Sequence, residues 1–410
     1  MADLLTQSSL EVAHSILDRV PLIDGHNDWP HLIRGYYDNR LDARFDRDRD
    51  LDGHVDIKRL RSGQYGGLFM SAYVDCPIHE ESFRDEDYIL SMRDTLQQID
   101  LIYRLVNLYA DDLYIARSSS DVTNVFSASK IAIIISIEGL HQIGNSKSVL
   151  RNYHRLGVRC ATLAHSQHNM YADSERGKPM HNGLSQEGEL ILREMNRIMI
   201  MIDLSHALHE VMHQVLDLSV APVVFTHSSC FALVASSRNV PDDVLDKLKL
   251  NCGIVMIRLI PQLTHKDTSR AHINHVVDHI IHVGDRIGFN HVGIGSDYDG
   301  MEKGVIEAEE AGKLPQLVAC MISRSISIEN VEKIIGNNVL RVMSEVEAVA
   351  ERLLTEQAQE YNIQQLWNKD FRDWVRNEYP SAEQDTDTVR STSLERHNQL
   401  PSISASEYKC

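Results

Sequence analysis

The stretch IAIIISIEG, residues 131–139, decides the fold. A single serine interrupts its apolar run, whereas a strand with one solvated face would alternate apolar and polar residues. The stretch therefore predicts a strand that is buried on both faces, as in a parallel sheet covered by helices. Seven further short runs of mainly apolar residues have the same character, and they lie at 21–26, 66–74, 160–165, 200–206, 222–227, 253–259 and 292–297.

Helical patterns separate these runs. Ser185, followed by acidic residues, marks the start of a predicted helix at 185–198, and Pro241, followed by two aspartates, marks another at 241–249. Further helices are predicted at 84–109, 270–287 and 328–343. Eight strands that alternate with helices predict an α/β fold, a (β/α)8 TIM barrel, although an open doubly wound sheet would alternate in the same way.

Four segments are expected along the 410 residues. They are an N-terminal helix at 1–20, the barrel at 21–345, a helical extension at 346–379 and a tail at 380–410. The tail is poor in large apolar residues, so we expect it to be disordered.

Composition limits the expected partners and location. The net charge of −18 argues against nucleic acid and against an anionic membrane surface as partners. No window approaches the ~18 apolar residues of a membrane-spanning helix, and the N-terminus lacks the pattern of a secretory signal. The six cysteines form no CxxC pair and are expected to be free thiols of a reducing compartment. We therefore expect a cytoplasmic protein.

Histidines or carboxylates end six of the eight predicted strands. Each one alone has an ordinary explanation, because a histidine at a strand end is more often a satisfied structural side chain. In a barrel, however, the carboxyl ends of all strands share one rim, which is the catalytic face. Convergence on that rim predicts a metal site. The residues are His26 with Asp28, Glu138, His165, His206, His227 and Asp297.

These residue types suit a dinuclear centre at the C-terminal rim, for Zn²⁺ or a similar divalent ion. His26 and Asp28 can hold one ion, and His206 and His227 can hold the other. Glu138 lies between the two pairs in strand order and is the natural bridge. We expect two Zn²⁺ per chain.

Four residues other than these five ligands are candidates for catalysis or substrate binding. Asp297 can accept a proton and return it to a leaving group, and His165 can hydrogen-bond a developing oxyanion. Arg238 follows the sixth strand. A surface arginine is the commoner case, but a guanidinium on this rim suits a bidentate grip on a substrate carboxylate. Trp29 is predicted to be an aromatic wall of the substrate site, although ordinary packing is an equal alternative.

Seven motifs occur in order along residues 20–345: DGHND (24–28), IEG (137–139), LAHS (163–166), MNRIMIMIDLSH (195–206), FTHSS (225–229), SRNVPDD (237–243) and GSDYDG (295–300). In these motifs the chain resembles the renal, or membrane, dipeptidase family of metallopeptidases, within the amidohydrolase group. The resemblance implies a zinc pair held by the five ligands above with the glutamate bridging. It also implies that His165 steadies the tetrahedral intermediate, that Arg238 holds the substrate's C-terminal carboxylate and that Asp297 transfers protons. Related enzymes often form homodimers.

The chain departs from the family after the seventh strand. A tyrosine-containing run is replaced there by MIRLIPQL, residues 256–263, with Ile260 where an aromatic residue is expected. Cysteines that form disulfides in secreted relatives are also missing. Such losses fit the soluble fungal biosynthetic dipeptidases of gliotoxin-type pathways, which trim glycine from cysteinylglycine adducts.

We therefore expect a zinc-dependent dipeptidase that hydrolyses a small dipeptide or a dipeptide-like adduct, such as a Cys-Gly S-conjugate, by attack of a metal-bridging hydroxide. Another amidohydrolase chemistry, such as that of a lactonase or deaminase, is the alternative. A non-catalytic metal-binding or scaffold protein is a third hypothesis. The complete ligand set argues against it, because a degenerate site would have lost members.

Overall fold

The structure, a computed structural model, describes residues 7–78, 83–359 and 368–379. Its strands are β1 Leu22–Asn27, β2 Tyr65–Ser71, β3 Leu113–Ile115, β4 Ile131–Glu138, β5 Val158–Thr162, β6 Met201–Asp203, β7 Val224–Phe225, β8 Ile254–Ile257 and β9 Val292–Ile294. All pairings between them are parallel, and the pairing of β2 with β4 closes the other eight strands, without β3, into a barrel. The predicted TIM barrel is confirmed, because this pairing joins edges that an open sheet would leave apart.

β3 is the strand that the sequence analysis does not predict. It pairs with the first half of β4, at Ile131–Ile133, while β5 pairs with the second half, at Ile135–Glu138. β3 therefore extends the sheet outside the barrel. Its three residues, of which Tyr114 is exposed, are too few to form a recognisable apolar run.

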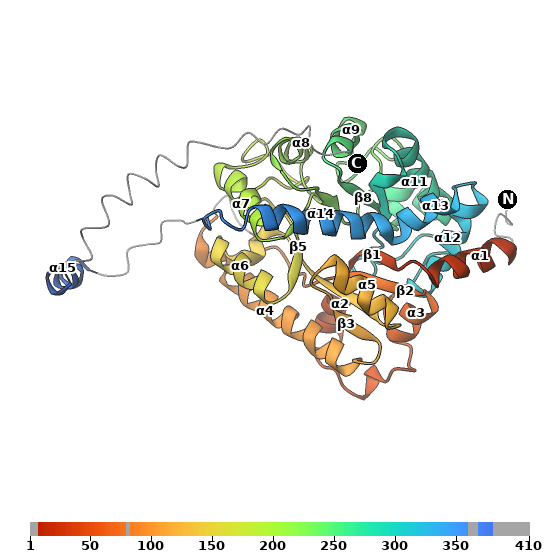
Figure 1. Cartoon of the computed structure of the whole chain (residues 1–410), viewed down its shortest axis with the longest axis horizontal. Coiled ribbons are helices and arrows are strands. Elements are labelled where there is room, and N and C mark those ends of the chain that lie inside the picture. The colour runs from red at the N-terminus through yellow and green to blue at the C-terminus, as the bar shows by residue number, and fades with distance from the viewer. Residues whose placement is uncertain (1–6, 79–82, 360–367, 380–410) are drawn as a thin grey trace. The chain divides into compact units, whose positions relative to one another are not determined.

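Helices surround the barrel in Figure 1. The predicted starts at Ser185 and Pro241 are confirmed as N-cap positions of α7 and α9, and the Ser185 side chain accepts a hydrogen bond from the Gly188 N–H. The helices are α1 Gln7–Leu17, α2 Trp29–Tyr36, α3 Ile57–Ser62, α4 Asp85–Leu108, α5 Ser119–Ser127, α6 Lys147–Arg155, α7 Gln186–Arg197, α8 His209–Leu218, α9 Asp242–Leu250, α10 Pro261–Thr264, α11 Ile273–Ile287, α12 Leu314–Ser323, α13 Ile328–Glu332, α14 Asn338–Arg352 and α15 Lys369–Glu378.

The helix predicted at 328–343 is confirmed as a helical segment, but it is not one regular α-helix. A π-helical turn at Lys333–Asn337 separates α13 from α14. Gly336 in this turn lies against the start of β1, and a Cβ atom there would be 2.0 Å from the carbonyl oxygen of Pro21. The wider π turn brings the backbone against the barrel, which a regular helix carrying a side chain at this position would not allow.

α14 closes the amino-terminal end of the barrel. Its buried residues pack with side chains from the barrel interior, such as Ile134 and Ile254, in one apolar cluster (α14 is blue in Figure 1). Val346 and Val349 belong to that cluster, so the predicted boundary between 345 and 346 falls inside a helix of the barrel. The described chain instead divides between Ala358 and Gln359, and α15 belongs to the second unit. The predicted tail lies outside the described residues.

The cysteines and the helices bear on the expected location. Cys76, Cys160, Cys230 and Cys320 are free thiols, as expected. Cys252 is disulfide-bonded, so the expectation of free thiols is wrong for this residue. Among the described helices, none combines the length and apolar character needed to cross a membrane.

Candidate metal centre

The carboxyl ends of the barrel strands bring six of the predicted site residues together. His26 lies in β1 and Glu138 ends β4, and the others follow strand ends closely. His206 and Asp297 have positive φ angles of 64° and 67°, which are costly for residues other than glycine. Such strain persists where the surrounding structure holds it, and it occurs most often at functional sites. The six residues, His26, Asp28, Glu138, His206, His227 and Asp297, are all buried.

The two carboxylate oxygens of Glu138 face different partners. Oε1 lies 3.1 Å from Nε2 of His206 and 3.2 Å from Nε2 of His227. Oε2 lies 3.6 Å from Nε2 of His26, and this nitrogen is 3.1 Å from Oδ2 of Asp28. The two oxygens of Glu138 thus face two separate groups of potential metal ligands, His206 with His227 at Oε1 and His26 with Asp28 at Oε2.

The first group has the dimensions of a metal site. Nε2 of His206 and Nε2 of His227 are 3.1 Å apart, so together with Oε1 of Glu138 they form a nearly equilateral triangle. Three atoms that bind one Zn²⁺ tetrahedrally, at about 2.0–2.1 Å, lie roughly 3.3 Å from one another. The triangle therefore matches one face of a tetrahedral zinc site.

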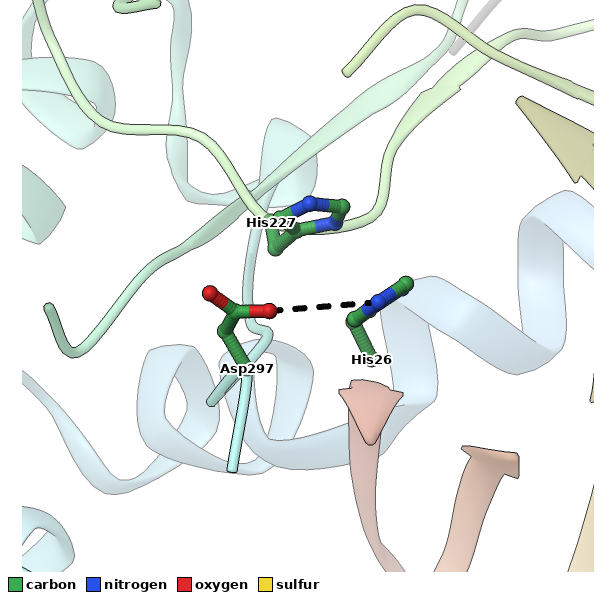
Figure 2. Close-up of side chains that lie close together, drawn as sticks. All are labelled: His26, His227 and Asp297. Atoms are coloured by element: carbon green, nitrogen blue, oxygen red, sulfur yellow. Dashed lines mark ion pairs between the residues drawn. The ribbon is translucent and has the colours of Figure 1, made fainter. Parts of the chain in front are cut away.

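Asp297 enlarges the set of possible ligands beyond the sequence prediction. Three groups have ligand atoms close enough to hold an ion: His26, Asp28 and Glu138; Glu138, His206 and His227; and His26, His227 and Asp297. Figure 2 shows the last group, in which His26, at the end of β1, and Asp297 point toward each other below the ring of His227. Nε2 of His26 and Oδ1 of Asp297 are 3.9 Å apart.

The charge states of His206, His227 and Glu138 fit a cation. For His26, burial opposes protonation, but the neighbouring carboxylates of Asp28 and Glu138 raise its pKa well above the ordinary range. Burial lowers the pKa values of His206 and His227 well below their ordinary range, so both imidazoles are neutral and can offer a lone pair. Burial opposes ionisation of Glu138, but His165, His26 and its other histidine neighbours lower its pKa well below the usual range. Oδ1 of Asp28 is buried without a hydrogen-bond partner in the described structure, and a metal ion would satisfy it.

Thr226 orients the ring of His227. The Thr226 hydroxyl donates to Oδ2 of Asp203 at 2.7 Å, so its oxygen accepts from the Nδ1–H of His227 at 2.8 Å. A proton on Nδ1 leaves the lone pair on Nε2, which points toward Glu138. Asp203 is in turn held by the backbone N–H groups of Ser205 and Thr226.

The hydrogen bonds from Asp203 through Thr226 to His227 predict that Thr226→Val weakens metal binding by about 10- to 100-fold, because nothing then selects the Nδ1–H tautomer of His227. Metal affinity by competition with a chelator measures the effect. Thr162→Val is the matched control, since the buried Thr162 hydroxyl also donates to Oδ2 of Asp203, at 2.6 Å, but makes no hydrogen bond to His227 in the described structure. Equal affinities for the two variants would contradict the proposed role of Thr226.

A cavity of about 390 Å³ opens onto these residues. His165 lies on it, with 17% of its side chain exposed and Nε2 3.7 Å from Oε1 of Glu138. Many of the described residues that line the cavity carry carboxylates. The lining residues are Asp28, His31, Tyr73, Asp75, Glu138, His165, His206, Arg258, Asp297, Asp299, Gly300, Met301 and Glu302.

Trp29 is not a wall of this cavity. It is fully buried and stacks on Tyr109 with ring centroids 6.3 Å apart. As the first residue of α2 it points into the core below the rim, so the prediction of a substrate contact is corrected.

Arg238 lies near the site but is not among the lining residues. Its Nη1 donates to Oγ of Ser228 and its Nη2 to the carbonyl oxygen of His227. Its Nε is buried and has no hydrogen-bond partner in the described structure. Burial, with repulsion from Arg258, lowers the pKa of Arg238 to about 9.

Sequence reasoning missed Arg258, Thr226 and Asp203. Arg258 directly follows β8, in the same position relative to its strand as the predicted ligands, and it lines the cavity. A charged residue directly after a buried strand was an available signal. The hydroxyl and carboxylate that orient His227 have no comparable signal, because their function depends on contacts between neighbouring strands.

Comparisons with known proteins agree with this geometry. The sequence profile described as membrane dipeptidase (peptidase family M19) matches residues 10–357. Dipeptidase tcpJ of Claviceps purpurea is 49% identical, covering 95% of this chain and 97% of the relative, and dipeptidase verJ of Clonostachys rogersoniana is 44% identical, covering 91% and 96%.

Two solved structures share the fold. The probable dipeptidase PvdM from Pseudomonas aeruginosa overlays with a TM-score of 0.76 at 20% identity, over 84% of this chain and 100% of that chain. A metallo peptidase from Rhodobacter sphaeroides, solved with a phosphinate mimic of the dipeptide L-Ala-D-Ala, overlays with a TM-score of 0.72 at 25% identity, over 80% and 99%.

Proposed function

Because the chain belongs to the membrane dipeptidase family, peptidase family M19, and is a peptide hydrolase of the metallopeptidase class, we propose that it is a dipeptidase that uses two Zn²⁺ per chain. The proposed ligands are His26 and Asp28 for one ion, His206 and His227 for the other, and Glu138 for both. The observation that carries the proposal is the division of the Glu138 oxygens between the two groups.

When bound, the ions would lower the pKa of water and polarise the scissile carbonyl. His165 supplies a hydrogen bond to the carbonyl oxygen as negative charge develops on it, which its position on the cavity supports. Asp297 takes a proton from the attacking water and delivers it to the departing amine. Burial raises the pKa of Asp297 above its ordinary value, against the effect of Arg258, which suits a group that must hold and release a proton.

The free ends of a dipeptide suit the charges around the cavity. Carboxylates dominate its wall, which favours a free amino group. We propose that Arg238 binds the substrate's C-terminal carboxylate. Its buried Nε, which has no hydrogen-bond partner in the described part of the chain, is available to donate to that carboxylate. Cysteinylglycine S-conjugates, cleaved with release of glycine, are the proposed substrates within this class, on the resemblance to fungal biosynthetic dipeptidases.

Metal removal tests the proposal. We expect treatment with a zinc chelator to lower kcat/KM on dipeptides by about 10³-fold, because the metal contributes several kcal/mol to the transition state, and added Zn²⁺ to restore it. The substrate panel contains free dipeptides, dipeptide amides, a cysteinylglycine S-conjugate and a lactone. Full activity of metal-free protein would contradict the proposal, as would turnover of the lactone in preference to every dipeptide.

We further propose a cytoplasmic location and a homodimer. The four free thiols of the described residues support a reducing compartment, although the disulfide of Cys252 is unusual there. Imaging of a fluorescent fusion tests the first proposal, and light scattering of the purified chain tests the second.

A further inference from the structure

Arg258 is the one lysine or arginine among the described residues that line the cavity. It is 8% exposed and follows β8 directly. Its Nε donates to Oδ2 of Asp297 at 2.7 Å, and its Nη2 donates to the same oxygen. Two donors of one guanidinium therefore hold a single carboxylate oxygen.

The other oxygen of Asp297 faces the candidate metal ligands. Oδ1 lies 3.9 Å from Nε2 of His26, on the side away from Arg258. The backbone of Asp297 is also fixed, because its N–H donates to the carbonyl oxygen of His26 at 3.0 Å and its carbonyl accepts from the N–H of Gly300 at 3.1 Å. With the backbone held, the side chain can still rotate about its Cα–Cβ and Cβ–Cγ bonds, and the second rotation, that of the carboxylate group, has only a broad torsional preference.

That rotation matters because Asp297 has two competing roles. Together with His26 and His227 it is close enough to act as a metal ligand, and a carboxylate with both oxygens turned to a cation is a poorer proton acceptor. The two bonds from Arg258 keep Oδ2 away from the ligand group and leave one oxygen directed at the reaction site.

We propose that Arg258 is a positioning residue for hydrolysis. By holding Oδ2 of Asp297 it maintains this carboxylate as the proton acceptor and prevents both of its oxygens from binding metal. The inference rests on the proposed dipeptidase function. Arg258 is distinct in this respect from Arg238, whose hydrogen bonds go to Ser228 and to the backbone of His227.

The alternative role for Arg258 is to bind the substrate carboxylate directly. It would require Arg258 to share or release Asp297, since Nε and Nη2 are both engaged with Oδ2. The two roles predict different kinetics. Loss of a positioning residue lowers kcat, whereas loss of a group that binds substrate and transition state equally raises KM.

The test compares Arg258→Met and Arg258→Lys with wild type on a free dipeptide, with Zn²⁺ bound. We expect Arg258→Met to lower kcat by about 10²-fold, the effect of a misplaced catalytic group, with KM within roughly threefold of wild type. Arg258→Lys should recover about tenfold of that loss, because an ammonium keeps the charge and one donor but not the planar pair. Metal content and the Kd for a phosphinate dipeptide analogue should stay within about threefold of wild type.

Arg151→Met is the matched control. Arg151 donates to the fully buried Glu194 at 2.9 Å, in the helical layer, so this variant also breaks an ion pair with a buried carboxylate. It should keep the wild-type kcat. If Arg258→Met does not fold, as judged by its thermal melt, the Arg258→Lys variant carries the test through its kcat.

Two results would overturn the inference while wild type hydrolyses dipeptides: unchanged kcat in both Arg258 variants, or a KM and phosphinate Kd raised more than about tenfold with kcat retained. Wild type that binds Zn²⁺ but hydrolyses no dipeptide would overturn the proposed function and the inference with it.

Discussion

Glu138→Gln is expected to lose both metal ions and to lower kcat/KM by about 10³-fold or more. Each oxygen of Glu138 faces a different ligand group, so one change removes a ligand from both. A neutral amide also presents an N–H₂ group where a second anionic oxygen is required. Metal content per folded chain and kcat/KM on a dipeptide are the two measurements.

Glu194→Gln is the control for this prediction. Glu194 is as buried as Glu138 but accepts hydrogen bonds from Arg151 and Arg197 in the helical layer. We expect this variant to be less stable, because it disrupts a buried ion pair, yet to keep its metal content and kcat. If Glu138→Gln retained two ions per chain, the assignment of Glu138 as the bridge would be wrong.

Asp297→Asn is expected to lower kcat by about 10²- to 10⁴-fold, the usual contribution of a general acid–base group, while the metal content stays unchanged. An amide cannot accept the proton of the attacking water at the required position. The expected result separates the two roles open to Asp297, because loss of a metal ligand would lower metal content together with kcat.

Asp112→Asn is the corresponding control. Asp112 is 1% exposed and is held by Arg47 and Arg61, so it tests the general effect of removing a buried aspartate charge. It should leave kcat unchanged. A metal content that falls in Asp297→Asn alone would assign Asp297 as a ligand and contradict its proposed role in proton transfer.

The barrel could be predicted because its signal is local. The stretch at 131–139 is apolar on both faces whatever surrounds it, and β4 occupies Ile131–Glu138 as expected. The failures occur where local signal is absent or is overruled. β3 is too short to have a pattern, and the helix expected at 328–343 contains a π-helical turn where Gly336 lies close to Pro21, a contact between distant parts of the chain.

In the candidate site, too, residues with a local sequence signal could be predicted, and features that depend on packing could not. His26, Glu138, His206 and His227 could be proposed from the sequence, because each follows an apolar strand and barrel topology places all strand ends on one rim. Trp29 also follows a strand, but it is buried in the core, since the direction of its side chain depends on how α2 packs beside Tyr109.

The sequence by itself determined the architecture, the rim and the chemical types gathered there, because strand burial and residue identity are written along the chain. Only the tertiary structure decided how Glu138 divides its two oxygens, which tautomer Thr226 selects in His227, and that Arg258 rather than Trp29 faces the cavity. These features depend on distances of a few ångströms between side chains from different strands, and periodicity in one segment carries no information about the side chains of the next.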